Sequence, residues 1–253
     1  MKRIIFLTSL LTLSVFTFAQ KKAILHYSFV QNIGGRLITS SLDQHYVNGR
    51  SIELPVIHKR LNDTTIYDGG KVVKNIYING NAKRFPFVLK TPLSKSLIYA
   101  ESIWIKPTVL VIDSLNNFKW RISKESKNIG DVNCVKAETF FRGRNYIAWF
   151  KPDQNIQAGP WKFGGLPGII YEVADANGLF AYALNEVELV DDFAIELKVP
   201  EAYANDQIIP HQDFINLWKE TKLEVEKNND KVTSTLNGSS SVKHAVAPLK
   251  ELY

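Results

Sequence analysis

The sequence predicts a mainly β (β-rich α+β) protein, in which a curved antiparallel sheet carries one C-terminal amphipathic helix packed on it. Two observations lead to this prediction. Short runs of β-branched and aromatic residues, separated by Gly, Asn, Asp and Pro, follow one another from Lys22 to about Val199, which is typical of antiparallel strands. Only after Pro210 do apolar residues recur at the spacing of a helix.

The composition limits the classes to which the protein can belong. Of its 253 residues, 45% are hydrophobic and 22% charged, which is ordinary for a globular protein and disfavours a disordered, collagen-like or polytopic membrane protein. The single cysteine, Cys134, excludes an intramolecular disulfide, a CxxC redox pair and a Cys-rich zinc site. Packing and hydrogen bonds must therefore stabilise the fold.

The first 19 residues have the pattern of a secretory signal peptide. Lys2 and Arg3 precede an uncharged stretch that ends at Phe18, and the small residue Ala19 stands where a signal peptidase would cut. The alternative is an uncleaved N-terminal anchor. This pattern predicts an exported protein of the periplasm or outer envelope, with no spanning segment after cleavage. Because the only cysteine lies far from the cleavage site, we expect no lipid anchor.

The charge of the chain does not indicate nucleic-acid binding. The formal net charge is +6, and removal of residues 1–19 takes away two of the positive charges. The remaining lysines and arginines are scattered along the chain instead of gathering on one segment. We therefore expect no nucleic-acid partner.

Short apolar runs and the turn residues between them predict the bounds of the strands. Asn48-Gly49, Asn79-Gly80 and Asn177-Gly178 accept positive φ angles and suit two-residue hairpin turns. The predicted strands are 23–30, 37–47, 51–57, 64–66, 72–78, 85–89, 95–103, 108–113, 119–126, 132–141, 146–151, 168–175, 179–190 and 193–199.

One segment near the C-terminus has helical periodicity. Phe214, Leu217, Trp218, Thr221 and Val225 follow Pro210 at i, i+3, i+4, i+7 and i+11. This spacing predicts an amphipathic helix over about 211–227 with its apolar side on the sheet. The polar run that follows predicts a mobile tail over 231–253, so the sequence predicts one β-rich domain over 20–230.

The segment 159–170 holds the densest local signal, with four glycines and two prolines around two large aromatic residues. It cannot be helical, and it lacks the spacing of a phosphate-binding loop. Two interpretations are open: a rigid corner in which aromatic side chains fill the core, and an exposed surface for a ligand or partner, with Trp161 as the contact residue and Phe163 and Leu166 in the core. The candidate binding residues are Gly159, Pro160, Trp161, Phe163, Gly165, Leu166, Pro167 and Gly168.

Residues 165–170, Gly-Leu-Pro-Gly-Ile-Ile, resemble the signature of the GLPGLI family, a group of exported bacterial proteins. The resemblance covers about residues 95–225. It includes the segments 120–122, 125–130, 134–137, 141–144, 146–150 and 159–163, and Asp213-Phe214 at the start of the helix. It implies an exported, β-rich domain and assigns no activity to any residue.

No catalytic pattern stands out in the sequence. Cys134 lies in a strand pattern without an adjacent base, the five histidines form no HxxxH or HxH pair, and there is no GxSxG motif. We therefore expect no metal or cofactor. The sequence favours a non-enzymatic binding or accessory protein of the envelope, for a hydrophobic ligand, a peptide or an outer-membrane partner. The alternative is a secreted hydrolase whose residues converge in the fold, such as Cys134 with His26 or His58.

Overall fold

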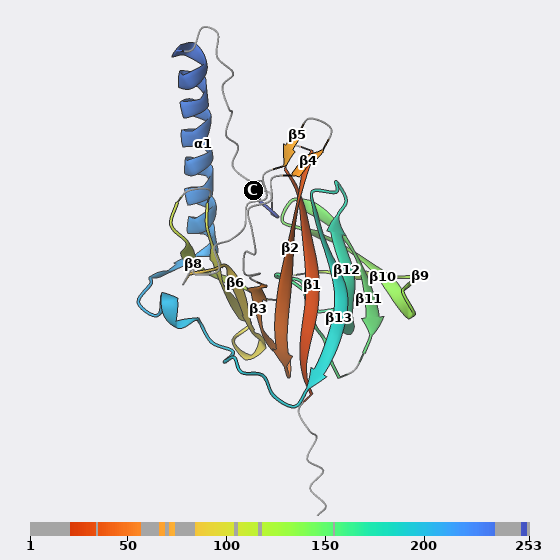
Figure 1. The fold of residues 1–253 in the computed structure, drawn as a ribbon. Coiled ribbons are helices and arrows are strands. Elements are labelled where there is room, and N and C mark those ends of the chain that lie inside the picture. The colour runs from red at the N-terminus through yellow and green to blue at the C-terminus, as the bar shows by residue number, and fades with distance from the viewer. Residues whose placement is uncertain are drawn as a thin grey trace, which may run out of the picture.

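A computed structural model describes residues 21–33, 35–56, 66–68, 71–73, 84–103, 106–115, 118–153, 155–235 and 249–251. The predicted signal peptide lies outside these ranges, as does His58. Within the described ranges the chain is mostly strand, and one long helix follows the sheet (Figure 1). The predicted fold class is confirmed.

Twelve strands form one sheet in the order β14-β8-β7-β6-β3-β2-β1-β13-β12-β11-β10-β9. Their bounds are β1 Lys22–Ile33, β2 Arg36–Val47, β3 Arg50–Pro55, β6 Phe87–Thr91, β7 Ser96–Glu101, β8 Val109–Ser114, β9 Arg121–Ile129, β10 Val132–Phe141, β11 Arg144–Pro152, β12 Gly168–Asp175, β13 Phe180–Val190 and β14 Ile208–Pro210. Two short strands, β4 Ile66–Asp68 and β5 Lys71–Val73, pair separately, and short 3-10 turns cover Pro92–Ser94 and Glu201–Tyr203.

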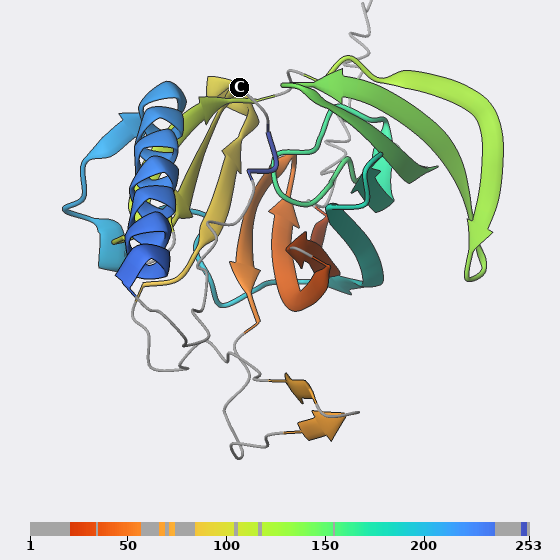
Figure 2. The ribbon, with the colours of Figure 1, turned by 90° about the horizontal axis from the view of Figure 1, so that it is seen from above.

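Neighbouring strands of the sheet are antiparallel except β14, which runs parallel to β8. The sheet is strongly curved, and the β9 and β10 strands arch away from the half that carries the helix (Figure 2). The predicted turn at Asn48-Gly49 joins β2 to β3, and both residues have positive φ, 49° and 80°. Such a turn matches the right-handed twist of the strands that it joins.

Helix α1, His211–Thr235, starts where the periodicity predicted and extends beyond 227. It stands beside β8 and β14 at one end of the sheet (Figure 1). Phe214, Ile215 and Val225 are buried, and burying an apolar side chain of this size contributes about 1.5–3 kcal/mol. In the part of the chain that the structure describes, no helix is both long and apolar enough to cross a membrane.

Two predictions about the C-terminal half are wrong. Residues 193–199 are irregular instead of a strand. Their alternating apolar residues Ile195, Leu197 and Val199 do pack against a small core cluster, which explains the strand-like pattern without a ladder. The predicted tail is wrong in its two described parts: the helix continues to Thr235, and residues 249–251 dock on the domain, with Glu251 only 4% exposed. The rest of 231–253 lies outside the described residues.

Candidate functional site

The segment between β11 and β12 is a loop whose central side chains point into the core. Trp161 is 5% exposed, and Phe163 and Leu166 are each 2% exposed. The T-shaped contact of Trp161 with Phe163 continues to Tyr146. Trp161 is thus a core residue, and its predicted role as an exposed contact residue is not supported by its position. Of the other candidate binding residues, Gly159, Pro160 and Gly168 are also buried, whereas Gly165 and Pro167 are exposed.

Two glycines of this loop are required for different reasons. A Cβ atom on Gly168 would lie 2.0 Å from the backbone oxygen of Lys151, so the strands at this point approach too closely for a side chain. Gly165 has a φ of +81° and open space around it. The loop therefore needs glycine once for close approach and once for its backbone conformation.

Three polar side chains from neighbouring strands hold the loop backbone, and we call Gln44, Glu53 and Lys90 the loop clamp. Lys90 Nζ donates to the carbonyl oxygens of Gly159 at 2.6 Å and Phe163 at 2.8 Å. Gln44 Nε2 also donates to the Gly159 oxygen, at 2.7 Å. The backbone N–H of Trp161 donates to Glu53 Oε2 at 2.7 Å. These bonds hold Trp161 at a φ of 48°, which is uncommon for a bulky residue.

The loop clamp contains two buried groups of opposite charge, Lys90 and Glu53, that influence each other. Burial lowers the pKa of Lys90 to about 8, and the charge of Glu53 acts against this shift. Burial also raises the pKa of Glu53, against the charge of Lys90 and the hydrogen bond from Trp161. Each charge thus depends on the other, because a buried charge without a partner is strongly destabilising.

A cleft of about 390 Å³ lies beside the loop clamp. The loop forms part of its wall through Gly159, Phe163 and Gly164. Its apolar lining includes Tyr46, Pro92 and Leu115. Its polar side chains come from β2, the β2–β3 turn, β3, β6 and the start of the loop: Gln44, Asn48, Ser51, Lys90, Asn155 and Gln157. Gln44 Oε1 is buried and has no hydrogen-bond partner among the described residues.

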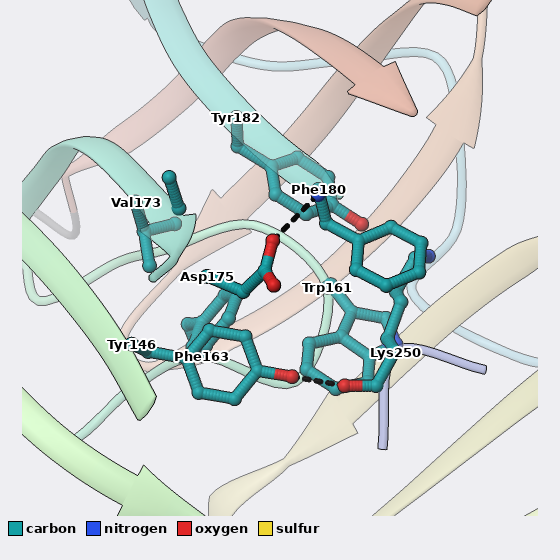
Figure 3. Close-up of a pocket in the computed structure, with 9 residues that line it drawn as sticks. Tyr146, Trp161, Phe163, Val173, Asp175, Phe180, Tyr182 and Lys250 are labelled. Carbon is teal, nitrogen blue, oxygen red and sulfur yellow. Dashed lines mark hydrogen bonds between the residues drawn. The ribbon is translucent and has the colours of Figure 1, made fainter. Parts of the chain in front are cut away.

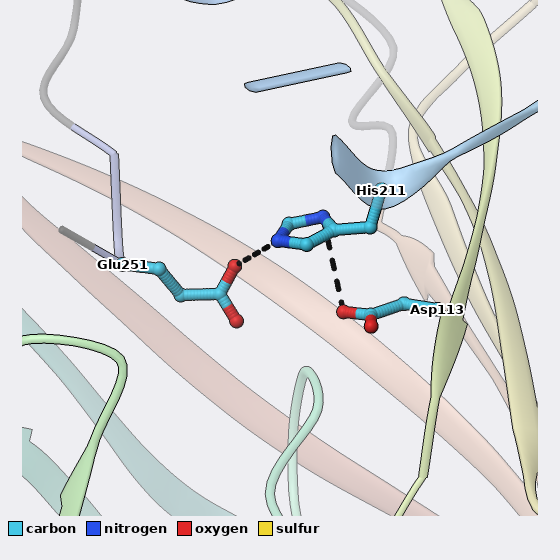
Figure 4. Close-up of side chains that lie close together, drawn as sticks. All are labelled: Asp113, His211 and Glu251. Atoms are coloured by element: carbon cyan, nitrogen blue, oxygen red, sulfur yellow. Dashed lines mark ion pairs between the residues drawn. The ribbon is translucent and has the colours of Figure 1, made fainter. Parts of the chain in front are cut away.

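A second set of charged residues lies around the side chain of Lys162, and we call Asp113, Arg142, Lys162, His211 and Glu251 the charge cluster. Lys162 Nζ contacts Asp113 Oδ2 at 2.7 Å and Glu251 Oε2 at 3.0 Å. Arg142 donates to both oxygens of Asp113 at 2.7 Å and to Glu251 Oε1 at 3.0 Å. His211 lies between the two carboxylates (Figure 4), with Nε2 3.0 Å from Glu251 Oε2.

The charge cluster strongly favours ionised carboxylates. Burial acts to raise the pKa of Asp113, but hydrogen bonds from Arg142 and the charge of Lys162 hold it well below its usual range. Burial likewise opposes ionisation of Glu251, but the hydrogen bond from His211 and the charges of Lys162 and Arg142 lower its pKa to about 2. Both groups are therefore anions near neutral pH.

The charge cluster does not have the chemistry of a metal centre. Ligand atoms of Asp113, His211 and Glu251 lie within 4.8 Å of one another, close enough for one ion. Lys162 and Arg142 already contact both carboxylates, and their positive charges would repel a cation at the same place. Tyr99 Oη also lies 2.8 Å from His211 Nδ1. These contacts describe an ion-pair network.

The hydrolase pairing of Cys134 with His26 is not formed. Cys134 lies on β10 and His26 on β1, and β11, β12 and β13 separate these strands in the sheet. Four strand spacings correspond to roughly 19 Å along the sheet. Cys134 is fully buried, and burial raises its pKa to about 11, whereas His26 Nδ1 lies 2.7 Å from Asp43. The thiol is therefore a poor nucleophile.

The sequence did not identify most residues of these two regions. Glu53 and Lys90 stand as single charges within apolar strand runs, which is a weak signal of a buried polar contact. Arg142 occupies a two-residue hairpin turn with Gly143, and its φ is 44°. An arginine at a turn position that favours Asn or Gly could have been noticed as unusual.

Comparisons with known proteins give likeness of fold alone. No family model matches the chain, and neither does any curated protein. Two structures of PNGF-II, in the C2 and P21 space groups, have a TM-score of 0.50 and 13% identity over 81% of this chain. The match covers 34% of each PNGF-II chain, so this chain spans about a third of their length. A putative outer membrane lipoprotein-sorting protein domain from Vibrio parahaemolyticus has a TM-score of 0.25 and 7% identity, over 73% of this chain and 89% of that domain.

Proposed function

We propose that the protein is a non-enzymatic binding or accessory protein of the bacterial cell envelope, and that its binding site is the cleft beside the loop clamp. The observation that carries this proposal is the cleft itself, whose volume of about 390 Å³ is in the range of ligand sites. The signal-peptide pattern and the GLPGLI resemblance support the envelope location.

The lining of the cleft favours a peptide segment over a hydrophobic ligand. Gln44, Asn48, Asn155 and Gln157 present amide groups, which pair with the N–H and C=O groups of a peptide backbone. A segment of an outer-membrane or envelope protein supplies backbone groups of this kind.

Site-directed photo-crosslinking in cells tests the site and the ligand class together. Gln157 and Lys124 both have exposed side chains, but only Gln157 lines the cleft. With p-benzoylphenylalanine at 157 we expect an adduct that contains a peptide, and none with the same residue at 124. Asn155→Trp, which adds bulk to the cleft lining, should reduce the adduct.

Three outcomes of this experiment would overturn the proposal. Equal amounts of adduct at 157 and 124 would show that the cleft is not the binding site. An amount of adduct at 157 that Asn155→Trp leaves unchanged would show the same. A lipid adduct at 157 would show that the cleft binds a hydrophobic ligand instead of a peptide. N-terminal sequencing of the protein from the envelope fraction tests the location separately: we expect a mature chain that starts at Gln20, and retention of Met1 would contradict export by cleavage.

A further inference from the structure

Residues 249–251 contact the domain through both their backbone and their side chains. The carbonyl oxygen of Leu249 accepts a hydrogen bond from Arg144 Nη2 at 2.8 Å, and that of Lys250 accepts one from the hydroxyl of Tyr146. Both donors come from β11. Two consecutive backbone carbonyls are thus recognised whatever the side chains are, as in peptide-binding sites.

The side chain of Lys250 lies in an aromatic cage. Its Nζ is 4.6 Å from the ring centre of Phe29, 5.4 Å from that of Trp161 and 5.6 Å from that of Tyr182. Figure 3 shows Lys250 beside Trp161, Phe180 and Tyr182. An ammonium group at these distances is attracted by the faces of the rings. Glu101 and Glu53 add negative charge around it and act against the lowering of its pKa by burial.

The next side chain, Glu251, enters a pocket of opposite charge. Arg142, Lys162 and His211 contact its carboxylate at 3.0–3.1 Å. Among the five side chains of the charge cluster, Asp113 balances one of the two permanent positive charges and Glu251 balances the other. Around Lys250, the charges of Glu101 and Glu53 act on its ammonium group, and Lys90 also acts on Glu53. The domain therefore has a negatively charged subsite that holds Lys250. Next to it lies a positively charged subsite that holds Glu251.

The site extends beyond these three residues. A cavity of about 160 Å³ adjoins them, and its lining includes Phe29, Glu101, Phe214 and Trp218 in addition to Lys250 and Glu251. Leu249 packs against the main hydrophobic core. Backbone contacts, a cation cage, an anion pocket and adjoining space are the parts of a site that recognises a short peptide.

We propose that the domain carries a peptide-recognition site for a segment of the form apolar–Lys–acidic, and that residues 249–251 of the same chain occupy it. The site is distinct from the cleft beside Gln157. The site also binds this segment as a separate peptide. An identical peptide added in solution therefore replaces residues 249–251 once the chain has been cut.

Cutting the folded chain and exchanging its end tests this proposal. A recognition sequence for a specific protease is inserted after Thr235, and the whole chain is folded before it is cut. We expect the released C-terminal peptide to stay with the domain in gel filtration. A fluorescent synthetic peptide of residues 246–253 should then exchange into the site, as followed by fluorescence anisotropy.

A matched peptide tests whether the site recognises the order of the two charges. The doubly exchanged peptide, with Lys250→Glu and Glu251→Lys, has the same composition and net charge. Removing a partner from a buried charge pair costs 2 kcal/mol or more, so this peptide should need a concentration at least about 30-fold higher for the same displacement. On the domain side, Glu101→Gln should weaken binding of the normal peptide, whereas Glu220→Gln on the exposed side of α1 should leave it unchanged.

Three results would overturn the proposal. The first is a released peptide that separates from a domain that stays folded by circular dichroism. The second is equal displacement by the normal and the exchanged peptide. If cutting unfolds the domain, excess normal peptide should restore the fold, and failure to do so would be the third. Because none of these measurements involves the cleft, they leave the proposed function to its own test.

Discussion

The two charged regions that contact the 159–168 loop are built differently. The loop clamp takes its side chains from β2, β3 and β6 and binds main-chain atoms of the loop. The charge cluster binds a side chain of the same loop, Lys162, and draws its members from β8, the β10–β11 turn, α1 and residue 251. One region is complete within adjacent strands, whereas the other needs the end of the chain.

This difference indicates a division of roles. Main-chain contacts from neighbouring strands fix the path of the loop, so the loop clamp supports the fold. The charge cluster joins segments that are far apart in the sequence, and one of its carboxylates belongs to a segment attached only through the chain beyond α1. We therefore expect loss of Glu251 to remove contacts with Arg142, Lys162 and His211 and none from the loop clamp.

The largest effect is expected at the loop clamp. Lys90→Met removes the largest opposite charge that acts on the buried Glu53 and removes a donor from the Gly159 and Phe163 carbonyl oxygens, and taking away the partner of a buried charge costs about 3–5 kcal/mol in the free energy of unfolding. Adding Glu53→Gln, which keeps an acceptor for the Trp161 N–H, should recover part of the loss. Urea melts measure both changes, with Lys124→Met on the exposed side of β9 as control. A single variant as stable as the control would contradict the structural role of the loop clamp.

At the charge cluster we expect an effect that depends on pH. The pKa of Glu251 falls from its ordinary 4.5 to about 2 in the folded chain, so its stabilisation is present above pH 4.5 and is lost as the pH falls through about 2. This shift corresponds to about 3 kcal/mol. Glu251→Gln should thus be less stable than the wild type by about that amount at pH 7.

The comparison of the two proteins over pH provides the control. Denaturant melts from pH 7 to pH 2 should show the two stabilities converging below pH 4.5. A difference that stays constant over this range would assign the effect to packing instead of charge.

The smallest effects concern the loop that both regions contact. Gly168→Ala should destabilise by about 2–3 kcal/mol, because its Cβ would overlap the Lys151 oxygen. Gly165→Ala should lower the free energy of unfolding by only about 1 kcal/mol, because alanine is disfavoured at a positive φ but its Cβ meets no other atom here. Thermal melts compare the two variants. The reverse order would show that backbone conformation, and not the close approach of the strands, shapes the loop.

The sequence predicted well those features that have a local cause. The alternation in the strands, the Asn48-Gly49 turn and the helical spacing after Pro210 all depend on neighbouring residues, and the structure confirms them. Residues 193–199 show the limit of such reasoning: their alternation is real, but it serves packing against the small core cluster that includes Ile52 and Phe87, without strand pairing.

The two charged regions depend on contacts between distant residues, and no local pattern contains them. Lys90 and Gly159 are brought together by the fold, as are Lys162 and Glu251. The polar composition of 231–253 predicted a mobile tail, because nothing nearby in the sequence shows that the domain holds a cage for Lys250. The 159–170 segment was found by its composition, but composition alone could not tell a buried corner from an exposed surface.

The central position of β1 has a consequence for the way the protein folds. Lys22 pairs with Val190 and Gln31 with Phe180, so the first strand of the sheet needs a partner from the last third of the chain. Closing so long a loop costs entropy before any contact rewards it, and domains rich in such distant pairings fold slowly. β1 can pair early with the neighbouring β2, but its other edge stays without its partner until β13 has been made.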